Sequence, residues 1–411
     1  MKRLVLLTLV SLAAHAQQYV GVASCANSGC HGSTHPLNAT RVLQNEYYTW
    51  LNGDRHAQAY NVLFNDRSAR IVRNMHLARK AYEESLCLDC HSTNVPAKLI
   101  AGHIDPEDGV QCEACHGPAG GWRAEHTEPG WTHQQSIERG MIDQHDVRVR
   151  AHVCGQCHIG HEKKDVDHEL IASGHPLLAF ELDNYSETMP AHWNANETHG
   201  VRAWATGQAM ALRDSLANLA WHARGDKWPE FSDMTCTNCH HSLKTSGRRQ
   251  ERGWPGRAGL PAWSPQRWTV TRLIVARVSS SSRSQLDDAL RDVATRVSRM
   301  NDPSGTAQAA DNARKIANDV VARIDALSWN DSDVRSMMRA IAESDYVDVH
   351  SAEQAALSLQ SLNSALARKS PAQLKSATTK AIDDLFADIQ NRDDYDAARF
   401  AEKLRALRAS L

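Results

Sequence analysis

The sequence predicts an all-α protein in two parts, a Cys- and His-rich region with little regular β structure and an antiparallel helical bundle behind it. Three observations support this prediction. All ten cysteines, ten of the eleven tryptophans and every histidine except His350 come before residue 269. The residues after it repeat apolar side chains at helical spacing. Between the two regions, residues 253–268 are rich in Pro, Gly and Trp, which predicts a boundary.

Residues 1–16 have the features of a cleavable signal peptide. Lys2 and Arg3 form a positive start, residues 4–12 are apolar, and residues 14–16 read Ala-His-Ala, a small-residue cleavage site. This apolar stretch is too short to cross a bilayer, and no later run approaches the roughly 18 apolar residues that a membrane helix needs. The chain is therefore expected to be periplasmic or secreted, without a membrane span.

Length and charge limit the remaining alternatives. At 411 residues the chain is long enough for two or three domains, and we expect a first domain over residues 17–265 and a second over 266–411. The 46 basic and 48 acidic side chains give a formal net charge of −2. Such a balance argues against nucleic acid as a partner.

Five pairs of cysteines, each followed directly by a histidine, are the most informative pattern. Cys-x-x-Cys-His is the attachment signature of a c-type haem: each thiol adds to one vinyl group of the porphyrin, and the imidazole binds the iron. One pair has four residues between its cysteines. The pattern predicts five covalently bound haems. The anchors are Cys25, Cys30, Cys87, Cys90, Cys112, Cys115, Cys154, Cys157, Cys236 and Cys239, and the proximal iron ligands are His31, His91, His116, His158 and His240.

Other uses of paired cysteines explain the pattern less well. A disulfide framework also uses an even number of cysteines, but it gives no reason for the histidine after each pair. Zinc ribbons need two pairs to converge on one ion, and five pairs cannot be matched evenly. A thioredoxin-like centre would require a βαβ context, which this region lacks.

The remaining histidines predict distal iron ligands. Fifteen histidines of the haem region are left after the proximal ligands, an excess that points to irons bound by two imidazoles. For any single histidine among these fifteen, a surface or hydrogen-bonding role explains its presence as well as a role as iron ligand does. His168 and His175 lie seven residues apart on one expected helix face, with Pro176 placing His175 at the helix end, so they could serve two neighbouring haems. His350 lies far from any motif in the sequence.

The chain resembles the cytochrome c-554 family of multihaem proteins. The resemblance is carried by Trp50-Leu-Asn-Gly-Asp-Arg-His-Ala, by Gly109-Val-Gln-Cys-Glu-Ala-Cys-His-Gly-Pro and by Trp122-Arg-Ala-Glu-His, and it covers residues 20–160 with the first four motifs. It implies a mostly helical fold with closely stacked haem pairs. The longer first motif, the fifth motif and the C-terminal third lie outside the family pattern. Residues 168–193 look more like larger multihaem cytochromes of environmental bacteria.

The resemblance also implies distal ligands. His56 matches the family histidine that serves the third haem, at His116, and His126 matches the one that serves the first haem, at His31. The family's second haem, here at His91, has no distal protein ligand, which implies a small-molecule site there. In this chain His76 or His103 could close that position.

Residues 266–411 are expected to form helices with short loops. Apolar seams run through Leu286, Leu290, Val293, Val297 and Met300, through Ile316, Val320, Ile324 and Leu327, through Leu359, Leu362 and Leu366, and through Ile382, Leu385 and Ile389. Asp302-Pro303 is expected to separate two helices, and Ser370-Pro371 is expected to begin another. No catalytic constellation is evident in this bundle. It is a candidate surface for docking or for assembly into a homo-oligomer or a complex.

The function most consistent with these features is electron transfer along five haems, with redox proteins as partners whose identity the sequence does not give. No catalytic residue is needed for that role, so an electron carrier is favoured over an enzyme. The alternative is an oxidoreductase of a small nitrogen or oxygen compound, such as nitric oxide or hydroxylamine, at one open haem. A third interpretation is a structural haem subunit of a larger respiratory complex.

Overall fold

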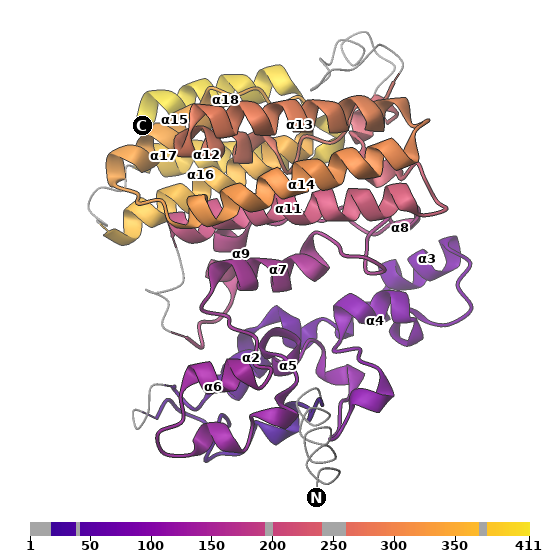
Figure 1. Ribbon diagram of the computed structural model, residues 1–411, viewed down its shortest axis with the longest axis vertical. Helices are drawn as coiled ribbons and strands as arrows, with labels where there is room; N and C mark the ends of the chain where they lie inside the picture. Colours follow the sequence, from indigo (N-terminus) through magenta and orange to yellow (C-terminus); the bar gives the residue numbers. More distant parts are fainter. Residues whose placement is uncertain (1–17, 38–41, 194–199, 241–259, 370–375) are drawn as a thin grey trace, which may run out of the picture. The chain divides into compact units, whose positions relative to one another are not determined.

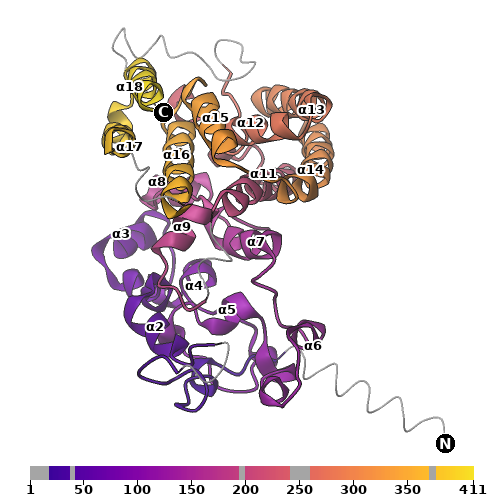
Figure 2. The same cartoon turned by 90° about the vertical axis from the view of Figure 1, so that its left-hand side faces the viewer.

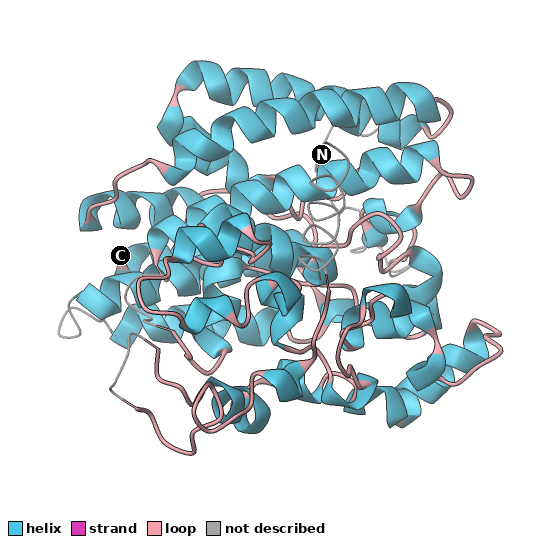
Figure 3. Cartoon of the chain, turned by 60° about the horizontal axis from the view of Figure 1, so that its bottom comes forward, coloured by secondary structure: helices cyan, strands magenta, loops and turns pink. Residues whose placement is uncertain are grey.

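The computed structural model describes residues 18–37, 42–193, 200–240, 260–369 and 376–411. In these ranges the regular elements are helices, and strand-like pairing is limited to isolated bridges such as Tyr19 with Ile100 (Figure 3). The all-α prediction is therefore confirmed. No helix of the described part is long and apolar enough to cross a membrane. The predicted signal peptide and the helix start at Ser370-Pro371 lie outside the described residues.

The chain divides into two compact units. The first comprises Met1–Cys157, Ala172–His175 and Glu187–Glu197, and the second comprises His158–Ile171, Pro176–Ser186 and Thr198–Leu411. The predicted boundary between residues 265 and 266 does not coincide with this division. The fifth attachment motif and the long helix before it belong to the second unit, because that helix packs with the C-terminal helices.

The first unit consists of short helices joined by long loops. Its α-helices are α2 (Glu46–Gly53), α3 (Asp66–Asn74), α4 (Ser85–His91), α5 (Cys112–His116), α6 (His133–Glu138) and most of α7 (Val147–His158) (Figure 1). Its buried apolar side chains form small separate clusters, such as Val22, Trp50 and Ala57, and Tyr60, Leu63 and Ala81. The described apolar side chains of this unit are thus divided among small clusters.

The segment around the third motif is fixed by its glycines and by a buried carboxylate. Gly109 has φ +67°, and a Cβ there would lie 2.5 Å from the carbonyl oxygen of His56. Only glycine therefore permits this close approach. The Glu113 carboxylate is 3 % exposed and accepts hydrogen bonds from the backbone N–H groups of Val20, Gly21 and Ala119. These bonds hold the N-terminal segment against α5.

The second unit contains a bundle of long helices. Its members are α11 (Val201–Arg224), α12 (Thr269–Val278), α13 (Ser280–Arg299), α14 (Pro303–Asp325), α15 (Asp331–Ala342), α16 (Val349–Lys369), α17 (Ser376–Ile389) and α18 (Ala397–Ser410). Both side views show α11, α13 and α14 running alongside one another (Figures 1 and 2). The short helices α8 (His168–Ser173) and α9 (Leu182–Thr188) precede the bundle.

The predicted seams are largely the buried faces of these helices. Leu286 and Leu290 of α13 are fully buried, and Asp302 caps α14 by accepting a hydrogen bond from the N–H of Gly305. In α14 the predicted Val320 and Ile324 are buried, whereas Ile316 is only half-buried and the neighbouring Ala313 and Ala317 are buried. Small residues are needed on this face because α14 packs closely on α11, a helix that the sequence analysis left out of the bundle.

Candidate haem sites

The ten cysteines of the five attachment motifs form no disulfide. Their sulfurs are therefore not held by one another, as covalent attachment to a porphyrin requires. Cys87 and Cys90 lie on α4, Cys112 and Cys115 on α5, so that one helical turn presents both sulfurs of a motif together with its histidine. Burial raises the pKa of the Cys112 thiol to about 12. The Cys112 thiol is therefore neutral in its surroundings.

Four proximal histidines each face a second imidazole at nearly the same separation. The ring centres lie 6.2 Å apart for His31 and His126, 6.5 Å for His91 and His175, 6.4 Å for His116 and His192, and 6.3 Å for His168 and His240. The described residues contain no group of three or more His, Cys, Asp or Glu side chains that could hold a metal ion. The repeated arrangement is thus two facing imidazoles beside a pair of thiols.

This separation fits an iron ion between the rings. First-row metal ions such as zinc bind an imidazole nitrogen at about 2.0–2.1 Å, and that nitrogen lies about 1.15 Å from its ring centre. An ion held between two facing imidazoles therefore sets the ring centres about 6.3–6.5 Å apart. His133 and His145, which belong to no motif, lie 5.2 Å apart, too close for an ion between them. The residues present therefore fit a c-type haem with two axial histidines.

Hydrogen bonds to Nδ1 orient these imidazoles. Nδ1 of His31 is 2.9 Å from the Glu46 carboxylate, and Nδ1 of His91 is 2.9 Å from the carbonyl oxygen of Ala59. Nδ1 of His126 likewise bonds the carbonyl oxygen of Arg123. A proton on Nδ1 leaves the lone pair on Nε2, which is the usual arrangement of a metal-ligating histidine.

At the second motif, His175 lies opposite His91. It follows Gly174, whose φ is +122°, at the end of a segment tied to α3 by a hydrogen bond from the Asn74 side chain to the carbonyl oxygen of Ser173. The resemblance implied an open position here, or closure by His76 or His103. His103 instead has a side chain that is 82 % exposed. The imidazole that faces His91 is that of His175, one of the two histidines whose spacing places them on one helix face.

At the third motif, the partner differs from the one that the resemblance implied. His192 faces His116, and burial, together with neighbouring imidazoles, lowers the pKa of His116 to about 4. His56 was expected opposite His116. Its pKa is raised by a hydrogen bond with Asp54, and Cys157 of the fourth motif is among the charges that raise it further. The ring that faces His116 is thus that of His192, and the assignment of His56 to the third haem stays a prediction.

Three motifs of the first unit are neighbours. The Cys25 thiol contributes to the raised pKa of Cys112, and Cys154 and Cys157 contribute to the raised pKa of Cys115. Such contributions act only over short distances in solution at ordinary ionic strength. The first and third motifs are therefore adjacent, and so are the third and fourth.

The fourth motif ends in the second unit, at His158, and the fifth motif lies wholly within that unit. The ring of His158 contacts Phe180 and Tyr185 at centre separations of 5.2 and 5.5 Å. At the fifth motif, the Sγ atom of Cys236 lies 3.9 Å from Nε2 of His350 on α16. The expectation that His350 is remote from every motif is thus wrong in space, because the bundle folds back on the fifth attachment site.

Sequence reasoning missed His192 as a candidate ligand. The only signal was its place in Met189-Pro-Ala-His-Trp, which had been noted for its resemblance to larger cytochromes but given no role. His126, His168 and His175 were chosen, and each of them faces a proximal histidine.

The family model of cytochrome c554 and c-prime matches residues 24–117, which contain the first three attachment motifs. The match is shorter than the resemblance over residues 20–160. No curated protein and no solved structure matches the chain. The family is one of haem c proteins with redox or electron-transfer roles. Over residues 24–117, this chain is similar to the cytochrome c554 and c-prime family.

Proposed function

We propose that the chain is a periplasmic electron carrier with five covalently attached haems, each bound by two histidines. The observation that carries the proposal is that four proximal histidines each face a second imidazole. The ring centres of each pair are 6.2–6.5 Å apart. An iron with two histidine ligands exchanges one electron with little rearrangement. The protein's residues then act as anchors, ligands and insulating packing. The periplasmic location rests on the signal-peptide features of residues 1–16.

The distal ligands we propose are His126 for the first haem, His175 for the second, His192 for the third and His168 for the fifth. For the haem anchored by Cys154 and Cys157 we propose His56. Its Nδ1 bond with Asp54 is 2.9 Å long and places the lone pair on Nε2. Cys157 lies near enough to be among the groups that raise the pKa of His56.

The alternative, an oxidoreductase of a small nitrogen or oxygen compound, needs one open iron position. The second haem is where the resemblance implied such a position. The facing of His91 by His175 argues against it. Electron transfer between redox partner proteins is therefore favoured, and the partners are to be identified by binding.

The proposal is tested by two measurements on the purified protein. The intact mass should exceed that of the mature polypeptide by five haems. Electron paramagnetic resonance of the oxidised protein should show only low-spin ferric haem, unchanged by nitric oxide. The variant His175→Gly should gain a high-spin signal worth about one haem in five, and nitric oxide should shift that signal.

A high-spin signal in the unaltered protein that responds to nitric oxide would contradict the electron-carrier proposal and favour the enzyme. The exposed His103 provides the matched control, because His103→Gly removes an imidazole that faces no proximal histidine. This control should keep the spectrum of the unaltered protein.

A further inference from the structure

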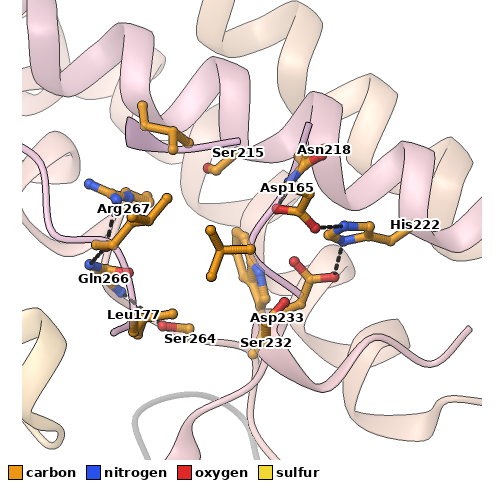
Figure 4. A pocket seen from close by; sticks show the side chains of 14 residues that line it. Asp165, Leu177, Ser215, Asn218, His222, Ser232, Asp233, Ser264, Gln266 and Arg267 are labelled. Atoms are coloured by element: carbon orange, nitrogen blue, oxygen red, sulfur yellow. Dashed lines mark hydrogen bonds and ion pairs between the residues drawn. The ribbon is translucent and has the colours of Figure 1, made fainter. Parts of the chain in front are cut away.

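A buried histidine of the second unit has carboxylates on both ring nitrogens. His222 lies on α11 and is 8 % exposed. Its Nε2 is 2.6 Å from Oδ2 of Asp165, and its Nδ1 is 2.8 Å from Oδ2 of Asp233 (Figure 4). Both nitrogens must donate to these acceptors, so the ring is an imidazolium and cannot be an iron ligand.

The charges around His222 favour this protonated form. Burial alone lowers the pKa of His222, but the charge of Asp233 and the hydrogen bonds from both carboxylates outweigh it and raise the pKa to about 11. The side chains of Asp165 and Asp233 are only 11 % and 14 % exposed, and burial raises the pKa of Asp233. Without a cation between them, Asp165 and Asp233 would repel each other in a medium of low polarity.

The two carboxylates come from the two segments that build the fifth haem site. Asp165 precedes His168 by three residues, and Asp233 precedes Cys236 by three residues in the loop that leads to His240. His222 therefore joins the segment of one facing imidazole to the segment of the other. The separation of the His168 and His240 ring centres is 6.3 Å.

A second contact joins the same segments. The Glu230 carboxylate accepts a 2.9 Å hydrogen bond from the backbone N–H of His168 and another from the N–H of Ser232. On the other side, Asp165 is oriented by Asn218 of α11, whose Nδ2 lies 3.1 Å from Asp165 Oδ1.

Glycine is required where the chain passes this cluster. Gly160 has φ +112°, and a Cβ there would lie 2.7 Å from Oδ1 of Asp165 and 2.9 Å from Nδ2 of Asn218. His222, Asp165, Asp233 and Asn218 line one side of a polar cavity (Figure 4). The cluster is thus built into the core of the second unit.

We propose that His222 is a positioning residue for the fifth haem: by bridging Asp165 and Asp233 it holds His168 and His240 on opposite sides of one iron. The proposal rests on the proposed function, because it requires a haem between these imidazoles. Its scope is narrower, since it concerns one of the five sites.

The test compares variants of the full-length, haem-loaded protein. His222→Leu removes both hydrogen bonds and leaves two buried carboxylates facing each other, so the segment of His168 should move away. We expect a high-spin signal of about one haem in five, carbon monoxide binding by the reduced protein at that haem, and a shifted midpoint potential for it alone. His168→Gly provides the reference spectrum of an open fifth haem.

Asp233→Asn separates the bridging geometry from the charge. An asparagine can keep a hydrogen bond with Nδ1 of His222, so the fifth haem should remain low-spin and closed to carbon monoxide. His103→Leu makes the same exchange as His222→Leu at an exposed histidine with a single carboxylate 3.9 Å away, and should leave all five haems unchanged.

An unchanged fifth-haem spectrum and potential in folded His222→Leu would overturn the proposal, as would an Asp233→Asn variant that opens the site as fully. If His222→Leu does not fold, His222→Gln decides the question: its amide can donate to only one carboxylate well, so the site should open partially, and a closed site would contradict the bridge. Failure of the proposed function itself would already be visible in the unaltered protein, as fewer than five haems or as high-spin iron.

Discussion

The two units become helical by different means. The first has helices as short as the five residues of α5, and its buried apolar clusters contain only three fully buried side chains each. The second has α11 with 24 residues and α14 with 23, and its core runs through successive helices. Helices shorter than about 12–15 residues are marginal without tertiary packing. The first unit therefore needs its cofactors as core material, whereas the bundle of the second supplies its own.

The largest difference between the two units is expected when the full chain is produced without haem attachment. We expect the first unit to remain unfolded and the bundle to keep most of its helical structure. Limited proteolysis should cut residues 18–157 rapidly and leave a resistant fragment containing α11–α18, while circular dichroism retains a cooperative transition. Equal resistance of both parts, or equal loss, would contradict the difference drawn between the units.

A smaller effect is expected from single side chains in each unit. Leu290 of α13 is fully buried, and Leu290→Ala should lower the free energy of unfolding of the bundle by about 2–5 kcal/mol. The control is Val62→Ala in the first unit, where the side chain is 43 % exposed and the expected loss is below about 0.5 kcal/mol. Both are measured by chemical denaturation of the haem-loaded protein. A loss below about 1 kcal/mol for Leu290→Ala would show that the bundle is not closely packed there.

The most gradual effect, spread over several pH units, concerns the pH dependence of the second unit. The folded pKa of His222, about 11, lies above the ordinary value of about 6.5, so the folded protein keeps a proton that the unfolded chain releases. The stabilisation is complete below about pH 6.5 and is lost as the pH rises through about 11. The slope is at most about 1.4 kcal/mol per pH unit for one proton.

Thermal unfolding between pH 7 and 10 measures this slope. The unaltered protein should lose stability more steeply with rising pH than His222→Leu, in which Asp165, Asp233 and Glu230 remain but the imidazolium is gone. Parallel curves for the two proteins would mean that His222 is neutral when folded.

Local patterns were the predictable part of the structure. The thiols and the proximal histidine of a motif lie within one helical turn, so spacing alone indicates the chemistry, and the seam of Leu286 and Leu290 follows from helical periodicity. Distal ligands come from distant segments, and their pairing depends on tertiary structure. For this reason His192, which faces His116, was overlooked.

The predicted boundary differs from the division into compact units for a related reason. Helix α11 carries Trp204, Trp221 and His222, so its composition resembles that of the haem region. Its Ala-rich surface, with Ala203, Ala209 and Ala220 buried, suits close helix packing instead. Composition indicates which cofactor a region binds, but it does not predict which helices a segment packs against.

The carboxylate of Glu113 has a consequence for the order of events during biosynthesis. It holds the backbone of Val20 and Gly21, which are 93 and 92 residues earlier in the chain. The N-terminal end of a chain is made first. The first Cys pair therefore emerges well before the glutamate that docks its segment, and also before His126. The first attachment site can therefore take its final form only after the third attachment motif and His126 have been made.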